Sequence, residues 1–267
     1  ISIIASWSAA SAFSSVPLTS NDKVPITLLT GFLGSGKTCT LQHLLENTDG
    51  IKIGVIVNDV ASVNIDSKLI AGKTESGIVE LQNGCACCSL ADELLTSVNA
   101  LLEDDTKREL DALVVELSGV ADPMAIKANW KTASSNGHPV TEKACLSQVV
   151  TLIDASTFGT DWMSFDVAGD RSWAEKDDCA GHREVPELLA EQVEAANVLV
   201  LNKKDLAGPE QVQVASTLAR SLNPDATMEE VEYGRVTPNT IVNKRGTKVR
   251  IAEDNKDADG IDDIDIM

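Results

Sequence analysis

A glycine-rich segment near the start of the chain limits its possible folds more than any other feature. Residues Gly31–Thr38 read GFLGSGKT, which has the spacing G-x-x-x-x-G-K-[ST]. The run before it, residues 25–30, is apolar and typical of a buried strand, and residues 37–46 carry leucines at helical spacing. A strand, a glycine-rich turn and a helix in this order predict a phosphate-binding loop.

Each residue type in this segment has a physical role. Glycines let backbone N–H groups surround phosphate oxygens without Cβ clashes, and a helix N-terminus favours an anion. We expect the ammonium of Lys37 to bind the β- and γ-phosphates of a nucleotide and the hydroxyl of Thr38 to ligate Mg²⁺. The predicted phosphate site comprises Gly31, Gly34, Ser35, Gly36, Lys37 and Thr38.

Apolar runs and helical patterns alternate along the rest of the chain. This alternation predicts an α/β fold of the P-loop NTPase type, with a mostly parallel sheet and helices on both faces. The predicted strands are 51–57, 77–81, 112–116, 149–153 and 198–201, the predicted helices are 91–102, 185–196 and 209–222, and the predicted loops are 134–146 and 166–184. The domain boundaries we expect are a targeting remnant or disordered tail at 1–23, a nucleotide-binding domain at 24–240, and an acidic tail or truncated start of a C-terminal domain at 241–267.

Charge and composition exclude several classes of partner. The net charge is −19 and aromatic residues make up 3% of the chain, so neither a basic face nor base stacking supports nucleic-acid binding. The negative charge also argues against an anionic membrane surface, and no apolar run reaches the roughly 18 residues of a membrane-spanning helix. The segment Ala10–Phe13 resembles the cleavage boundary of two-part plastid-targeting leaders, which predicts the plastid stroma, with the cytoplasm as the alternative.

A four-residue segment after the strand at 198–201 predicts which base is bound. Asn202–Asp205 reads NKKD and resembles N-K-x-D, the guanine-reading element of GTPases. A carboxylate at Asp205 can accept hydrogen bonds from N1–H and the exocyclic amino group of guanine, whereas adenine would leave a buried carboxylate unpaired. The cofactor-binding residues predicted here are Asn202, Lys203 and Asp205.

Acidic residues follow two of the predicted strands. Glu116 ends the strand at 112–116 and begins the spacing Glu116-x-x-Gly119, close to the Asp-x-x-Gly of most GTPases. We expect Glu116 to hold Mg²⁺ and the N–H of Gly119 to reach the γ-phosphate. Asp59 follows the strand at 51–57 and leads to Asp66, where a nucleotide-sensing loop with a metal-binding carboxylate is expected.

Three of the six cysteines are clustered. Cys85, Cys87 and Cys88 fall within four residues, a spacing too tight for a disulfide framework but suited to one soft or borderline cation such as Zn²⁺ or cobalt. Three ligands leave a fourth position for water or a recipient, and a redox-active or buried thiol group is the alternative. Isolated thiols are expected at Cys39, Cys145 and Cys179, and His182 is expected on the surface.

Taken in order, these motifs resemble the CobW-type GTPases, which include the zinc-regulated metalloprotein activators. The resemblance runs from about Val24 to Val236 and rests on five segments: Gly31–Thr38, Asn58-Asp59, Cys85–Cys88, Glu116–Gly119 and Asn202–Asp205. It implies a GTP-dependent metallochaperone with metal on the three clustered cysteines. Unlike most members, the chain shows no smaller C-terminal domain with His-rich segments and no evident client-binding motif at its N-terminus.

Three functions stay open on the sequence. The first is an enzyme that couples GTP hydrolysis, assisted by Lys37, Thr38 and Glu116, to transfer of zinc to a client metalloprotein. The second is a P-loop small-molecule kinase with a structural zinc, against which Asn202–Asp205 counts. The third is a metal sensor or buffer that hydrolyses nothing. No evident water-activating base is found, so slow turnover is expected, and a homodimer is a further expectation.

Overall fold

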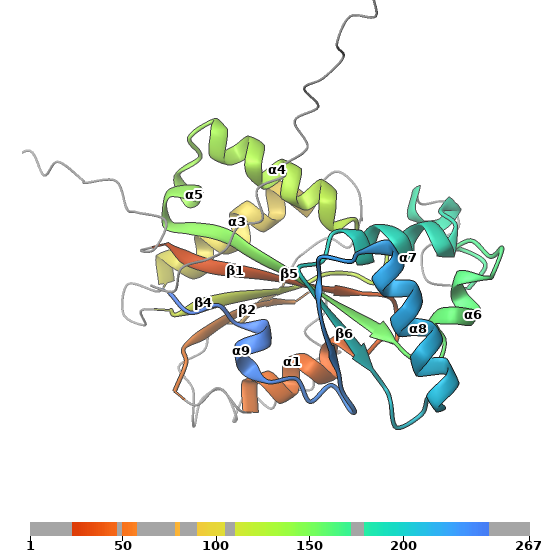
Figure 1. The fold of residues 1–267 in the computed structure, drawn as a ribbon. Helices are drawn as coiled ribbons and strands as arrows, with labels where there is room; N and C mark the ends of the chain where they lie inside the picture. Colours follow the sequence, from red (N-terminus) through yellow and green to blue (C-terminus); the bar gives the residue numbers. More distant parts are fainter. Residues whose placement is uncertain are drawn as a thin grey trace, which may run out of the picture.

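Seven strands form one sheet in the computed structural model, which describes residues 23–46, 50–57, 78–80, 90–104, 110–171 and 179–245 (Figure 1). The spatial order of these strands is β3-β2-β4-β1-β5-β6-β7, and every pairing between them is parallel. Their bounds are β1 Val24–Gly31, β2 Ile53–Val57, β3 Ile78–Glu80, β4 Ala112–Glu116, β5 Ala144–Asp154, β6 Val198–Asn202 and β7 Thr227–Glu230.

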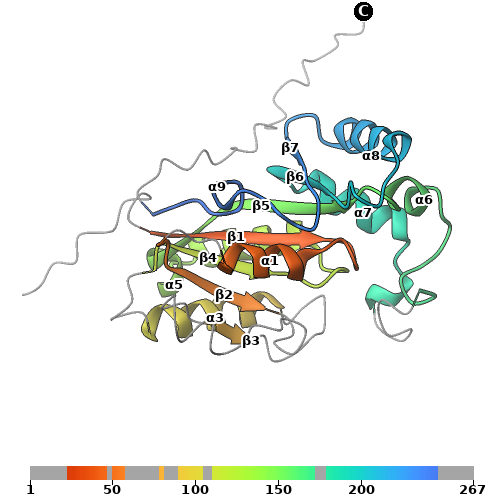
Figure 2. The same cartoon turned by 90° about the horizontal axis from the view of Figure 1, so that it is seen from below.

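Helices cover both faces of this sheet. Their bounds are α1 Lys37–Glu46, α3 Leu90–Asp104, α4 Pro123–Ser135, α5 Pro139–Lys143, α6 Phe158–Trp162, α7 Val185–Glu194, α8 Pro209–Leu222 and α9 Pro238–Ile241, with a 3₁₀ turn at Cys179–His182. α1 and α9 lie on one face, and α3, α4 and α5 lie on the other (Figure 1). Seen from below, β7 and α8 lie at one end of the sheet and β3 at the other (Figure 2). The predicted α/β fold with a parallel sheet is confirmed.

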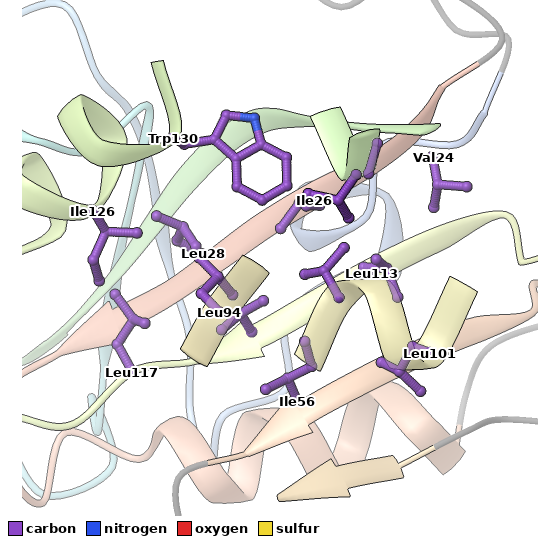
Figure 3. Close-up of a cluster of buried hydrophobic side chains, with 14 of the residues drawn as sticks. Val24, Ile26, Leu28, Ile56, Leu94, Leu101, Leu113, Leu117, Ile126 and Trp130 are labelled. Carbon is purple, nitrogen blue, oxygen red and sulfur yellow. The ribbon is translucent and has the colours of Figure 1, made fainter. Parts of the chain in front are cut away.

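Alternation of side chains along the central strands produces the two core layers. Ile26 and Leu28 of β1 face α3 and α4, where Trp130 packs over them (Figure 3). Leu29 points to the opposite face and packs with Leu41 of α1. Because β1, β4 and β2, which are consecutive in the sheet, are buried on both faces, their sequences read as continuous apolar runs. These runs are the ones that the sequence pattern predicted well.

The parallel register brings the ends of the strands together at one edge of the sheet. Leu29 pairs with Glu116 between β1 and β4, and Asp154 pairs with Asn202 between β5 and β6. The carboxyl ends of these four strands therefore carry the polar residues at the same edge. Ligands of open parallel sheets bind at this edge.

The C-terminal part of the described chain closes one face of the sheet. The hydroxyl of Thr27 and the side-chain amide of Gln148 both donate to the carbonyl of Ile241, each at 2.7 Å. Ile241 and Val242 are buried in the layer that contains α1. The packed core therefore extends to Val242.

The structure corrects the two predicted loops. Residues 134–146 contain α5 and the start of β5, and 166–184 contain the 3₁₀ turn and a bridge between Val167 and Glu184. The strand predicted at 149–153 is the second half of β5, and its first half was missed because those residues alternate between buried and half-exposed positions and carry polar side chains. No sequence pattern predicted α4, although Asp122 caps its first turn by accepting from the N–H groups of Met124 and Ala125. Among the described residues, no helix is long and apolar enough to cross a membrane.

Candidate nucleotide-binding site

The loop between β1 and α1 is shaped by two glycines that no other residue could replace. Gly31 has φ of 136°, and a Cβ there would lie 2.4 Å from the carbonyl oxygen of Leu152. Gly36 has φ of 102°, and its Cβ would lie 2.4 Å from Nδ2 of Asn202. The first glycine therefore packs against β5 and the second against the end of β6. This close packing forms the cradle that the sequence motif predicts.

Lys37 begins α1 and turns its side chain back over the loop. Its Nζ donates to the carbonyl of Gly31 at 2.6 Å and to that of Phe32 at 3.1 Å. Only 8% of the residue is exposed. Burial lowers the pKa of Lys37 to about 8, although the negative charge of Glu116 acts in the opposite direction. A buried cation next to the cradle can bind a phosphate oxygen in place of these carbonyls.

Thr38, in the first turn of α1, meets Glu116 at the end of β4. The hydroxyl of Thr38 donates to Oε1 of Glu116 at 2.9 Å, and Glu116 is 7% exposed. A hydroxyl and a carboxylate at this separation supply the hard oxygen ligands that Mg²⁺ prefers. The donor set therefore fits a magnesium ion, and binding of magnesium there stays a prediction.

Gly119 lies directly against the phosphate loop. A Cβ at Gly119 would be 2.7 Å from the backbone nitrogen of Leu33 and from its Cγ. Its carbonyl accepts a hydrogen bond of 2.9 Å from Nε2 of Gln192, a buried residue of α7. The glycine of Glu116-x-x-Gly119 is therefore held between the loop and a helix.

Asn202 connects three segments at the end of β6. Its Nδ2 donates to the carbonyl of Ser35 at 2.9 Å, and its Oδ1 accepts from the N–H of Gly234 at 2.9 Å. Gly234 has φ of 68°, and a Cβ there would lie 2.6 Å from Oγ1 of Thr40 in α1. Asn202 is 2% exposed, so it is a fixed tie between the phosphate loop and the turn that follows β7.

Lys203 and Asp205 differ in how they are held. Lys203 has φ of 64°, and its Nζ forms an ion pair of 2.6 Å with Oδ2 of Asp154 at the end of β5. Asp205 is exposed, so the buried carboxylate that we expected is found at the surface. Selection of guanine at Asp205 would therefore require the base itself to cover the carboxylate.

The family model for the CobW/HypB/UreG nucleotide-binding domain matches residues 25–230. This chain belongs to the CobW/HypB/UreG family. The match contains the phosphate loop, the Thr38–Glu116 pair and Asn202, whereas Gly234 lies beyond its end. The prediction of a P-loop fold of the CobW type is confirmed.

Proteins with names in this family are similar over most of the chain. The zinc-regulated GTPase metalloprotein activator 1 of Dictyostelium discoideum is 35% identical over 78% of this chain and 45% of that protein. The zinc chaperone YjiA of Escherichia coli (strain K12) is 33% identical over 84% of this chain and 62% of that protein. A crystal structure of a zinc-bound triple mutant of the YjiA GTPase is similar with a TM-score of 0.54 at 26% identity, over 84% of this chain and 62% of that one. The chain thus spans 45–62% of the length of these relatives.

The predicted metal-binding residues Cys85, Cys87, Cys88 and Asp59, together with Asp66, lie outside the described residues. Within the described ranges, no three His, Cys, Asp or Glu side chains gather as a metal site. Cys39 is an exposed free thiol, and Cys145 is half-buried, with burial raising the pKa of its thiol. His182 is exposed, as expected.

Three residues of the site were missed by the sequence analysis. Asp154 ends a buried strand as Glu116 does, and this shared pattern could have identified it. Gln192 and Gly234 lie far along the chain from the groups that they contact, so no local motif marks them. A small hollow adjoins Gln192 and Leu33 and is also lined by Phe32, Asp154, Phe158 and Leu189.

Proposed function

We propose that this chain is the nucleotide-binding unit of a GTP-hydrolysing metallochaperone that carries a thiolate-bound metal, zinc, to a client metalloprotein. The observation that carries the proposal is the meeting of Lys37, the Thr38–Glu116 pair and the Asn202 tie at one edge of the sheet. The names of the similar proteins support the same function, since two of them are called a zinc-regulated GTPase metalloprotein activator and a zinc chaperone.

Nucleotide binding would replace hydrogen bonds that the chain now makes to itself. The ammonium of Lys37 would leave the carbonyls of Gly31 and Phe32 for phosphate oxygens, which are stronger partners because they are charged. Thr38 and Glu116 would hold Mg²⁺, which when bound neutralises charge on the phosphates. Asp205 is exposed and would accept the hydrogen bonds of the guanine base.

Hydrolysis would depend on charge neutralisation at the γ-phosphate. Charge moves onto the phosphate oxygens as the bond to the leaving group breaks, and the ammonium of Lys37, which lies next to the loop, would stabilise that charge. Gly119 would contribute its N–H to the same phosphate from the other side of the loop. The predicted site contains no evident base that activates water, so we expect slow intrinsic turnover.

Metal transfer would involve the three clustered cysteines. Cys85, Cys87 and Cys88 stand in the sequence between Asp59 and Glu116-x-x-Gly119, two segments expected to respond to the γ-phosphate. We expect Zn²⁺ to bind more tightly with a GTP analogue than with GDP. By linkage, Zn²⁺ would then favour the analogue by the same factor, about 5- to 150-fold for a typical coupling.

Two measurements test this function. The first is single-turnover GTP hydrolysis with and without Zn²⁺, together with the affinities for ATP and GTP measured by calorimetry. Equal affinities for ATP and GTP would contradict a guanine-specific GTPase. The second is a zinc competition titration against a chromophoric chelator with GDP or with a non-hydrolysable GTP analogue. Replacing Cys85, Cys87 and Cys88 with Ser should remove tight zinc binding. Equal zinc affinity in both nucleotide states would make the cluster structural.

The client, a homodimer and a plastid location stay predictions.

A further inference from the structure

The turn that follows β4 is held by hydrogen bonds at both ends of one peptide group. The carbonyl of Gly119 accepts from Nε2 of Gln192 at 2.9 Å, and the N–H of Val120 donates to the hydroxyl of Ser118 at 3.3 Å. A further bond of 3.1 Å joins the N–H of Ala121 to the carbonyl of Ser118. The Gly119–Val120 peptide therefore has a set orientation, and Gln192 provides the part of that restraint that comes from outside the turn.

Gln192 itself has little freedom. It is 2% exposed, and its neighbours Leu189 and Val193 belong to the apolar core between α7 and the sheet. The backbone carbonyl of Gln192 accepts a bond of 2.7 Å from the hydroxyl of Thr151 in β5. A buried amide without a partner is unfavourable, so the contact with Gly119 is favoured once α7 has packed.

The other side of Gly119 rests on the phosphate loop. A Cβ at Gly119 would lie 2.7 Å from the backbone nitrogen of Leu33, a distance that only glycine permits. Gln192 donates a hydrogen bond to the carbonyl of Gly119, and on its opposite side Gly119 is in close contact with Leu33 of the phosphate loop. Gly119 is therefore fixed beside the loop that would hold the phosphates.

We infer that Gln192 is a positioning residue for the γ-phosphate: it holds Gly119 where the Gly119 N–H can bind a nucleoside triphosphate but has no partner in a diphosphate. This inference rests on the proposed function, because it concerns the same nucleotide site. It means that α7 contributes to the preference for GTP over GDP, although α7 is not part of the phosphate loop. Loss of the Gln192 amide would free the glycine and weaken only the contact that depends on the third phosphate.

The test compares two substitutions of glutamine in the full-length chain. Gln192→Met keeps the length of the side chain but removes the donor. Gln148→Met is the matched control, because Nε2 of Gln148 also donates to a backbone carbonyl, that of Ile241 at 2.7 Å, far from the nucleotide edge. Calorimetry measures the affinity of each protein for GDP and for guanosine 5′-(β,γ-imido)triphosphate with Mg²⁺.

We expect Gln192→Met to bind GDP within about twofold of the wild type and to lose about tenfold in affinity for the triphosphate analogue, the effect of one buried hydrogen bond. Gln148→Met should keep the wild-type ratio of the two affinities. An unchanged ratio in a folded Gln192→Met variant would overturn the inference alone. Failure of the wild type to bind either nucleotide would overturn the proposed function with it.

A second variant keeps the test decisive if Gln192→Met does not fold. In Gln192→Glu, the introduced carboxyl donates to the carbonyl of Gly119 when protonated and repels it when ionised. The preference for the analogue over GDP should therefore be close to that of the wild type near pH 5.5 and should be lost near pH 8, relative to the wild type in the same buffers. A merely structural role would leave this ratio independent of pH, which would overturn the inference.

Discussion

The edge of the sheet at which we expect the nucleotide to bind has two halves, and their polar groups form hydrogen bonds in different ways. In the phosphate half, at the ends of β1 and β4, Lys37 bonds to two loop carbonyls and Thr38 to Glu116. A nucleotide and its metal would replace these bonds. In the base half, at the ends of β5 and β6, Asn202 bonds to the carbonyl of Ser35 and the N–H of Gly234. A nucleotide would leave these bonds in place.

This difference separates residues expected to contact the nucleotide or its metal from residues that stabilise the structure of the site. Removing a side chain of the phosphate half should impair binding or hydrolysis with little loss of stability. Removing Asn202 should destabilise the fold, because two buried backbone groups would lose their partner. Stability and activity measured on the same variants therefore test whether the two halves differ as described.

Lys37→Ala should give the largest effect. Loss of one preorganised positive group should lower single-turnover hydrolysis by about 10²- to 10³-fold, because Lys37 stabilises charge that develops on the phosphates. The free energy of unfolding of Lys37→Ala should differ from that of the wild type by no more than about 1 kcal/mol, since the variant also removes the cost of burying an ammonium. The control is Lys131→Ala, an exposed lysine of α4. Near-native hydrolysis in Lys37→Ala would mean that the activity comes from elsewhere.

Asn202→Ala should be the most destabilising substitution of the site. Two orphaned backbone groups predict a loss of about 2–4 kcal/mol, which corresponds to a fall in melting temperature of roughly 4–16 °C for a domain of this size. Thermal unfolding followed by circular dichroism measures it. Asn129→Ala, at an exposed position of α4, should leave the melting temperature unchanged. If Asn202→Ala melted with the wild type, the distinction between the two halves would fail.

The parts of the fold that the sequence predicted have either uniform burial or a clear signal where the element starts. β4 and α8 were predicted with the bounds that the structure has, because β4 is buried on both faces and α8 begins at Pro209. The first half of β5 and all of β7 carry polar, partly exposed residues that hide the strand pattern, whereas the buried second half of β5 was predicted as the strand at 149–153. β7 is recognisable as a strand only from its pairing with β6, which is a long-range contact.

The same reasoning explains which site residues were predicted. Lys37 and Thr38 belong to a contiguous motif whose geometry is local. Gln192 and Gly234 act through partners 73 and 32 residues away, so only the packing of α7 and the turn after β7 brings them to the site. The predicted burial of Asp205 was wrong because its environment depends on a ligand and not on the chain alone.

Asp205→Asn should sharpen the comparison, since this residue of the base half is exposed and is not part of the Asn202 tie. We expect a 10- to 100-fold loss of GDP affinity, equivalent to about 1.4–2.8 kcal/mol, with an unchanged melting temperature. An amide there would oppose the exocyclic amino group of guanine but donate to the corresponding oxygen of xanthine, so xanthosine diphosphate should gain affinity. Calorimetry with both nucleotides measures this, and Asp225→Asn is an exposed control. Unchanged GDP affinity would show that the base is read elsewhere.

The smallest expected effect is a pH dependence of nucleotide binding that comes from the phosphate half alone. Burial lowers the pKa of Lys37 to about 8 in the nucleotide-free chain, and phosphates would raise it again. Above pH 8, binding must therefore be accompanied by proton uptake at Lys37, and GDP affinity should fall by about fourfold between pH 7.0 and pH 8.5. This range stays below the pH at which guanine N1 loses its proton.

The stability of the nucleotide-free chain should change with the opposite sign. Between pH 8 and the ordinary lysine pKa of 10.5, the unfolded state binds more protons at this residue than the folded state does, so the contribution of Lys37 to stability rises with pH. Calorimetry of GDP binding in buffers with different ionisation enthalpies measures the proton uptake, and denaturant unfolding from pH 8 to pH 10.5 measures the stability. Lys37→Ala removes both trends if Lys37 causes them, and Cys39→Ser tests the contribution of the exposed thiol two residues away. A fourfold fall in affinity that persists in Lys37→Ala would assign the pH dependence to another group and would leave the buried ammonium without a role in binding phosphate.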